Sequence, residues 1–111
     1  MAHNPPGTSE FLKQAKTFIR SNQRSILDRR TSFISTLAEL RITIDDVWDD
    51  LLALTENDPW QCEPDDNPTY GGVVWITKKR LHGERIYIKL KIKNSPSGQL
   101  LVMSYHIDDF C

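Results

Sequence analysis

The chain has 111 residues, 39% hydrophobic and 26% charged, which suits one globular domain with a buried core rather than two domains. Its two cysteines lack CxxC spacing and it has only three histidines, which argues against a disulfide framework and against a zinc or multi-histidine site. No apolar run approaches the ~20 residues of a membrane span, and the opening "MAHNPPGTSE" does not resemble a signal peptide. We therefore expect a cytoplasmic protein that needs no cofactor and contacts no membrane.

The formal net charge of −1 conceals a strong separation of charge along the chain. Residues 43–77 contain nine acids and no lysine or arginine, whereas residues 78–93 contain seven lysines or arginines and one acid. Blocks of opposite sign in one small domain predict a basic functional surface and a separate acidic one.

The start of the chain predicts an arm and a helix. Residues 1–8 are expected to form a flexible polar arm, which is followed by a single domain of residues 9–111. Ser9 is a good N-cap residue, and apolar residues recur after it at helical spacing as far as Ile19. Residues 24–28 fit either a short strand or an extended connector.

The rest of the chain predicts two more helices, a loop and three strands. Residues 31–40 fit a short helix, and Thr43 with Asp46 three residues later predicts a capping box at the start of another. Residues 56–72, "ENDPWQCEPDDNPTYGG", predict a loop. Strands are predicted by their alternating pattern at Val73–Arg80, Arg85–Lys93 and Gln99–Ile107. This order indicates an α+β fold, with N-terminal helices packed on a C-terminal antiparallel sheet.

The stretch "RIYIKLKIKN", residues 85–94, alternates aliphatic residues with basic or aromatic ones, which predicts a strand with two unlike faces. Antiparallel pairing with the last strand joins the aliphatic faces in one register only, because a slip of one residue would oppose aliphatics and lysines. On the aliphatic face that register pairs Ile92 with Leu101, Leu90 with Met103, and Ile88 with Tyr105. On the other face it pairs Tyr87 with His106 and Lys89 with Ser104, about 5 Å apart at Cβ.

These side chains are the types that metal-free RNA cleavage requires. A base must take the proton of the 2′-hydroxyl, cations must stabilise the pentavalent phosphate, and an acid must protonate the leaving oxygen. Histidine titrates nearest to neutral pH, so His106 is the candidate for proton transfer. Tyr87 could donate a proton or stack on a base, and Lys89 supplies charge. The alternatives are a solvated sheet face and a non-catalytic module that binds RNA or an acidic protein segment.

Two other groups of residues suggest function less directly. Asp45, Asp46, Asp49 and Asp50 could be proposed as a two-metal nuclease site, but four carboxylates near a helix start are explained by the helix dipole and a solvated face. Trp48 and Trp75 fall on apolar faces and are expected in the core. Trp60 and Tyr70 lie in the predicted loop, where they could form a lid or stack on a base.

The segments "GGVVWITKKRLHGERIYIKLKI" and "LLVMSYHIDDF" resemble the MqsR family of bacterial toxins, over about residues 11–108 of this chain. The resemblance implies a RelE-like fold and an mRNA endoribonuclease toxin of a type II toxin–antitoxin system that inhibits translation. It also implies attack by the 2′-hydroxyl without metal, a 2′,3′-cyclic phosphate product and a cognate antitoxin protein. The mRNA substrate could be free or on the ribosome.

The resemblance can be carried to individual residues. Tyr87 and Lys89 match the family's "VY-x-K" strand, and His106 stands where the family has a basic residue after "SF". Trp75 and Lys79 match a "VW…K" pattern. The chain departs from the family where a Tyr-Lys pair is replaced by "WQ", residues 60 and 61, and where "WQD" is replaced by "VVW", residues 73–75.

The residues and the resemblance together give a set of site predictions. The predicted catalytic residues are His106, Tyr87, Lys89 and Lys79. The predicted RNA-binding residues are Lys78, Arg80, Arg85, Lys91, Trp60 and Tyr70. No metal ligand is predicted.

Overall fold

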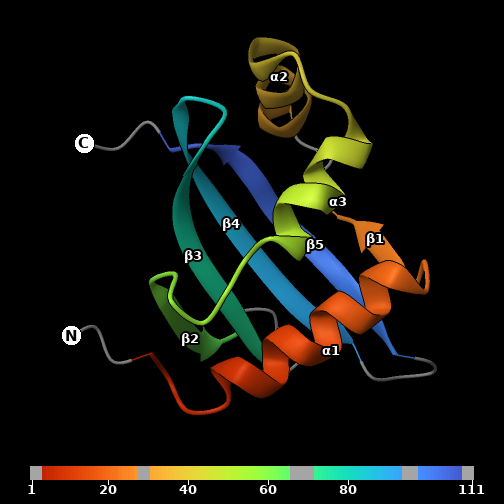
Figure 1. Cartoon of the computed structure of the whole chain (residues 1–111), viewed down its shortest axis with the longest axis vertical. Coiled ribbons are helices and arrows are strands. Elements are labelled where there is room, and N and C mark those ends of the chain that lie inside the picture. Colours follow the sequence, from red (N-terminus) through yellow and green to blue (C-terminus); the bar gives the residue numbers. More distant parts are fainter. Residues whose placement is uncertain (1–3, 28–30, 66–71, 94–97, 109–111) are drawn as a thin grey trace.

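A computed structural model describes residues 4–27, 31–65, 72–93 and 98–108. Within these ranges the chain forms three helices and one five-stranded sheet, which confirms the predicted α+β class (Figure 1). The elements in chain order are α1 (Thr8–Arg20), β1 (Arg24–Ile26), α2 (Thr31–Leu40), α3 (Ile44–Leu52), β2 (Trp60–Pro64), β3 (Val73–Leu81), β4 (Glu84–Lys93) and β5 (Gln99–Ile107). None of these helices has the length and apolar character needed to cross a membrane.

The sheet has the strand order β1-β5-β4-β3-β2. Strands β2 to β5 pair antiparallel, as predicted for the C-terminal strands, whereas β1 from the N-terminal half joins the same sheet by pairing parallel with β5. Of the two alternatives for residues 24–28, the strand is the one found. Strand β2 lies inside the predicted loop 56–72, because an edge strand tolerates Pro59 before it, Pro64 as its last residue and the acid Glu63.

The start of α3 was predicted correctly from its sequence, whereas the start of α1 was not. Thr43 and Asp46 form the predicted capping box, with Thr43 N–H donating to Asp46 Oδ2 at 2.8 Å. Helix α1 begins at Thr8 instead, after Gly7 with a φ of 89°, a left-handed conformation that glycine adopts without strain. Thr8 Oγ1 donates to Pro5 O at 2.6 Å. This turn, rather than Ser9, starts the helix.

The predicted arm is held against the domain over the part that the structure describes. The Asn4 side-chain amide donates to the carbonyls of Glu56 and Asp58, and Asn4 Oδ1 accepts from the backbone N–H of Trp60 at 3.1 Å. These contacts tie Asn4 to the domain, while the flexibility of the arm as a whole stays a prediction. Residues 1–3 of that prediction lie outside the described ranges.

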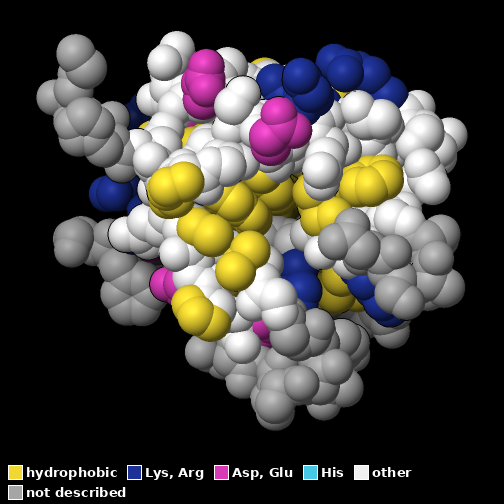
Figure 2. Space-filling model, turned by 90° about the horizontal axis from the view of Figure 1, so that it is seen from below, with side chains coloured by type: hydrophobic (Ala, Val, Ile, Leu, Met, Phe, Trp, Pro, Cys, Tyr) yellow, Lys and Arg dark blue, Asp and Glu magenta, His cyan; other side chains and the backbone are white. Residues whose placement is uncertain are grey.

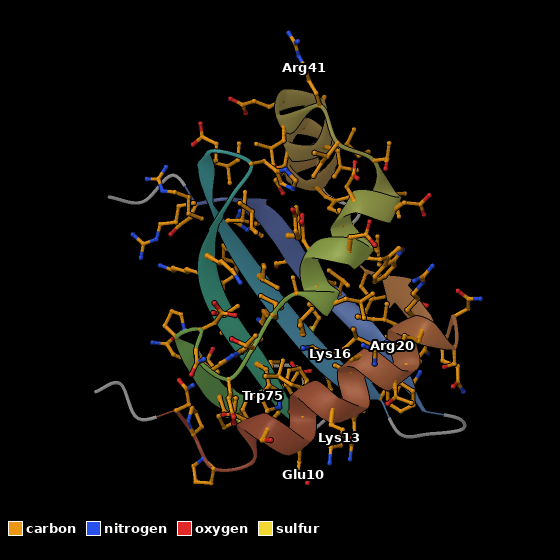
Figure 3. All side chains as sticks on the ribbon, in the orientation of Figure 1. Glu10, Lys13, Lys16, Arg20, Arg41 and Trp75 are labelled. Atoms are coloured by element: carbon orange, nitrogen blue, oxygen red, sulfur yellow. The ribbon has the colours of Figure 1, made fainter. Side chains whose placement is uncertain are left out.

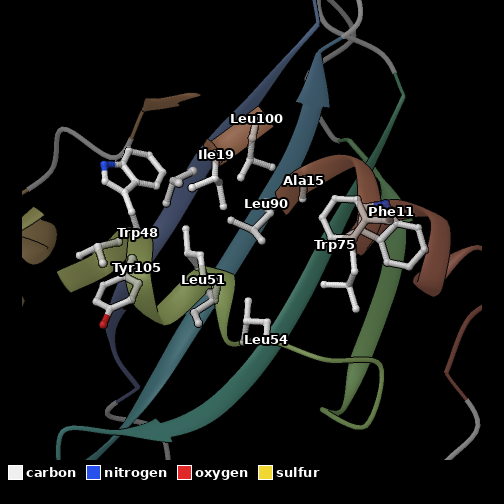
Figure 4. Packing of buried hydrophobic residues seen from close by; sticks show 14 of the residues in the cluster. Phe11, Ala15, Ile19, Trp48, Leu51, Leu54, Trp75, Leu90, Leu100 and Tyr105 are labelled. Carbon is white, nitrogen blue, oxygen red and sulfur yellow. The ribbon is translucent and has the colours of Figure 1, made fainter. Parts of the chain in front are cut away.

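Helices α1 and α3 lie across one face of the sheet, and α2 packs beyond them against β5 (Figure 1). Their apolar sides and the facing strands form one core, in which Phe11 stacks on Trp75 with ring centroids 4.7 Å apart (Figure 4). Trp48 is also buried there, so both tryptophans predicted in the core are confirmed. Thr36 Oγ1 accepts from Ile107 N–H at 3.2 Å and ties α2 to the end of β5.

The predicted pairing of the last two strands is confirmed over one half. Ile88 opposes Tyr105, Tyr87 opposes His106 and Lys89 opposes Ser104. Beyond Lys89 a bulge shifts the register, so that Leu90 opposes Val102 and Ile92 opposes Leu100, not Met103 and Leu101. Because of this bulge, the buried side chains of Leu100 and Val102 point into the core, and Leu101 lies on the opposite face of the sheet.

Candidate nucleic-acid interface

The face of the sheet that points away from the helices carries most of the predicted site. Side chains alternate along strands, so the residues of β3, β4 and β5 that oppose one another off the core share this face, which we call the open face. Lys78, Tyr87 and His106 form one row across three neighbouring strands. The Tyr87 and His106 rings are stacked, with centroids 5.3 Å apart and planes at 19°, and Lys78 Nζ lies 6.0 Å from the Tyr87 centroid.

The contact of the His106 ring with the backbone defines its tautomer. His106 Nδ1 lies 3.1 Å from the carbonyl oxygen of Ile107. A carbonyl only accepts hydrogen bonds, so this contact requires the proton on Nδ1 and leaves Nε2 as the basic nitrogen of the neutral ring. The ring is partly exposed, which leaves it within reach of solvent or a ligand.

A carboxylate that the sequence prediction missed lies among these cations. Asp108 follows β5, and its side chain is only 2% exposed. Its Oδ2 lies 3.2 Å from Lys78 Nζ and 3.7 Å from Arg85 Nε, and its backbone N–H donates to Arg85 O at 2.8 Å. The signal was present in the sequence, because Asp108 is two residues after His106 and alternation extends the same face. Asp108 therefore fixes two cations beside the Tyr87–His106 stack.

The other predicted residues of this face lie near the same row. Lys89 opposes Ser104 one pair along from Tyr87 and is partly exposed. Arg80 opposes Arg85 in the β3–β4 register, and its Nη1 donates to Gly83 O at 3.1 Å in the hairpin turn. The structure thus gathers six predicted residues on or near this row of the open face: Lys78, Arg80, Arg85, Tyr87, Lys89 and His106.

Two predicted lysines are not available on that surface. Lys79 opposes Ile86 on the side of the helices, and its Nζ lies 3.3 Å from Asp58 Oδ1. Lys91 does lie on the open face, but its side chain is 6% exposed and its Nζ lies 2.6 Å from Asp65 Oδ2. Lys91 therefore serves a buried ion pair rather than an exposed phosphate contact.

The two predicted aromatic contacts have different outcomes. Trp60 begins β2 and is buried, with its ring edge-on to Phe11 at 5.8 Å and its Nε1 donating to Thr55 O at 2.9 Å. It is a core residue, so the prediction that it lies in a loop as a lid or stacking platform was wrong. Tyr70 lies outside the described residues.

The acidic cluster of α3 has structural contacts. Asp46 closes the capping box, and Asp50 Oδ2 accepts from Tyr105 Oη at 2.7 Å and lies 2.8 Å from Nε2 of His82. Burial, the Asp50 hydrogen bond and the nearby carboxylates raise the pKa of the Tyr105 phenol, so it remains a neutral donor. Among the described residues, no three His, Cys, Asp or Glu side chains are grouped so that they could hold a metal ion.

Cations also occur on the opposite side of the molecule. Lys13, Lys16 and Arg20 are labelled along α1 in Figure 3, and within the described ranges none of them forms an ion pair. Figure 2 shows the molecule from below, where hydrophobic side chains form a band beneath a row of charged ones. The α1 cations have no histidine or tyrosine beside them in the sequence, which distinguishes them from the open face.

Comparisons with known proteins add no assignment to this geometry. No family model, no curated protein and no solved structure matches the chain.

Proposed function

We propose that this protein is a metal-independent endoribonuclease, an mRNA-cleaving toxin of a type II toxin–antitoxin system with a RelE-like fold related to the MqsR family. One observation carries the proposal: Tyr87 and His106 stack at 5.3 Å in the same row as Lys78, on a face that also holds Arg85 and Lys89. A proton acceptor, a hydroxyl donor and cations on one accessible surface are what cleavage by a 2′-hydroxyl needs.

The proposed reaction assigns a step to each group. His106 Nε2 takes the proton of the 2′-hydroxyl, and the 2′ oxygen attacks the adjacent phosphorus. The bond from phosphorus to the 5′ oxygen breaks, and the Tyr87 hydroxyl gives that oxygen a proton. Lys78, Arg85 and Lys89 stabilise the charge that collects on the phosphate oxygens. The products are a 2′,3′-cyclic phosphate and a 5′-hydroxyl, and Tyr87 regains its proton from the imidazolium through water.

The mechanism is tested by the products and by chelation. Purified protein incubated with single-stranded RNA in excess EDTA should cleave at the same rate as without EDTA. The new 3′ ends should be 2′,3′-cyclic phosphates, identified by mass spectrometry or by their resistance to phosphatase before acid treatment. Loss of activity on chelation, or 3′-hydroxyl ends, would overturn this mechanism and return attention to the carboxylates of α3.

The biological part of the proposal concerns cytoplasmic mRNA and a protein inhibitor. Cleavage of mRNA, free or on the ribosome, would stop translation and growth, so a cognate antitoxin must accompany the toxin. Expression of the chain from an inducible promoter should arrest growth, and co-expression of the product of the adjacent gene should restore it. A matched His106→Asn variant separates catalysis from binding, because a non-catalytic binding module should tolerate it.

A further inference from the structure

A cavity of about 370 Å³ opens at the β2 edge of the open face. This volume lies within the range of ~300–1,000 Å³ found for small-molecule pockets. Its lining includes Ile76, Gln61, Lys78 and Arg85. Because Lys78 also belongs to the Tyr87–His106 row, the cavity adjoins the proposed site of cleavage, and its β3 wall lies two strands from His106, about 10 Å across the sheet.

The cavity lining contains an apolar side chain, Ile76, and one side-chain amide, Gln61, that is available for hydrogen bonds to a ligand. Ile76 is buried and opposes Gln61 in the β2–β3 register. The other uncharged polar side chains of the lining are engaged, since Asn4 binds the backbone near the start of β2 and Thr77 Oγ1 donates to Pro59 O at 2.7 Å. The Gln61 side chain is exposed and makes no hydrogen bond to the described part of the chain.

The proposed mechanism assigns the cations of the lining to the phosphate, so they are not left to read a base. Lys78 Nζ and Arg85 Nε both lie against the Asp108 carboxylate, at 3.2 Å and 3.7 Å. Guanine presents two acceptors, O6 and N7, and is read best by a free arginine or lysine. Adenine presents a donor at N6 beside an acceptor at N7, which one glutamine amide complements with two hydrogen bonds. Proteins read single-stranded RNA through such base edges while the base face contacts a side chain.

We propose that this cavity binds one adenine of the RNA, with Ile76 against the face of the base and the Gln61 amide paired with its N6 and N7. The inference rests on the proposed RNA-cleaving function and adds a base preference to it. Gln61 is a specificity residue in this arrangement, since it touches the substrate away from the bond that breaks.

The test measures binding apart from cleavage. The probes are fluorescent 2′-O-methyl oligouridines with a single central A, G, C or U, which lack the attacking hydroxyl and cannot be cut. Wild-type protein should bind the A probe about tenfold more tightly than the U probe, the size expected for one good paired contact. Gln61→Ala should bind the A and U probes equally. Glu63→Ala, an exposed change on the same face of the same strand but outside the cavity lining, should keep the wild-type ratio.

Each outcome separates this inference from the function on which it rests. A wild-type preference for another base, no preference, or a preference that survives Gln61→Ala overturns the adenine subsite. A preference for A together with failure to cleave the corresponding unmodified RNA, both free and on ribosomes, overturns the endoribonuclease and leaves the subsite standing. Absence of salt-dependent binding to any probe overturns both. Circular dichroism of Gln61→Ala should match wild type, because the side chain is exposed on an edge strand.

Discussion

Lys89 and Lys91 lie two residues apart on the same face of β4, yet they have different surroundings. Lys89 is partly exposed beside the Tyr87–His106 stack, whereas Lys91 is buried against Asp65 and opposes Leu101 on β5. The open face therefore has one half in which the candidate catalytic side chains are partly exposed, and another half in which an ion pair is buried. Alternation assigns a residue to a face of a sheet, but it does not say which part of that face reaches solvent.

The largest expected effect concerns the stability of the half with the buried ion pair. Lys91→Ala would leave the Asp65 carboxylate buried without its cation, a change that costs about 3–5 kcal/mol of unfolding free energy for buried pairs. Lys89→Ala should cost less than about 1 kcal/mol, as surface changes do. Urea denaturation of both variants measures the difference.

A double variant tests whether the lost stability comes from the unpaired charge. Replacing both partners, Lys91→Met with Asp65→Leu, should recover most of the lost stability, because apolar residues of similar volume often replace a buried pair at little cost. Equal unfolding free energies for Lys89→Ala and Lys91→Ala would show that the two halves of the face do not differ as described.

The next effect concerns catalysis in the partly exposed half. His106→Ala should lower the RNA cleavage rate by ~10²-fold or more, the usual contribution of a general acid–base group. The melting temperature of the His106→Ala variant should stay near that of wild type, because the His106 ring is partly exposed on the side away from the core. Under the proposed relation to the MqsR family, which has a basic residue at this place, His106→Lys should retain some activity. Wild-type cleavage by a normally folded His106→Ala protein would remove His106 from the mechanism.

The salt dependence of RNA binding should distinguish the open face from α1. Each phosphate contact on a single strand adds about 0.7 to the slope of log K against log salt. Arg85→Ala with Lys89→Ala should therefore reduce that slope by about 1.4. Lys13→Ala with Lys16→Ala removes the same charge from the opposite side and should leave the slope unchanged. If the α1 pair changed the slope instead, RNA would bind on the helix side.

The site was predictable from the sequence where local pattern determines structure. The pairing of Tyr87 with His106 follows from two alternating strands and lies in the half of the register before the bulge at Lys89. The Thr43–Asp46 cap is likewise a signal within four residues. The errors arose from contacts distant in sequence. Strand β2 forms because β3 offers it hydrogen bonds, and Lys91 is buried because Asp65, 26 residues earlier, reaches it.

The smallest expected effect belongs to Lys79, next to Lys78 on β3 but on the other face of the sheet. Lys79 pairs with Asp58, and both side chains are partly accessible, at 29% and 13% exposure. Such a pair contributes roughly 0.2–1 kcal/mol, so Lys79→Ala should shift the unfolding free energy slightly. It should leave RNA cleavage unchanged, because the sheet itself separates Lys79 from His106. Lys78→Ala is the matched control, and it should slow cleavage roughly tenfold or more by removing a cation beside the reacting phosphate. If Lys79→Ala abolished cleavage while Lys78→Ala did not, the catalytic surface would lie on the helix side, around Asp58.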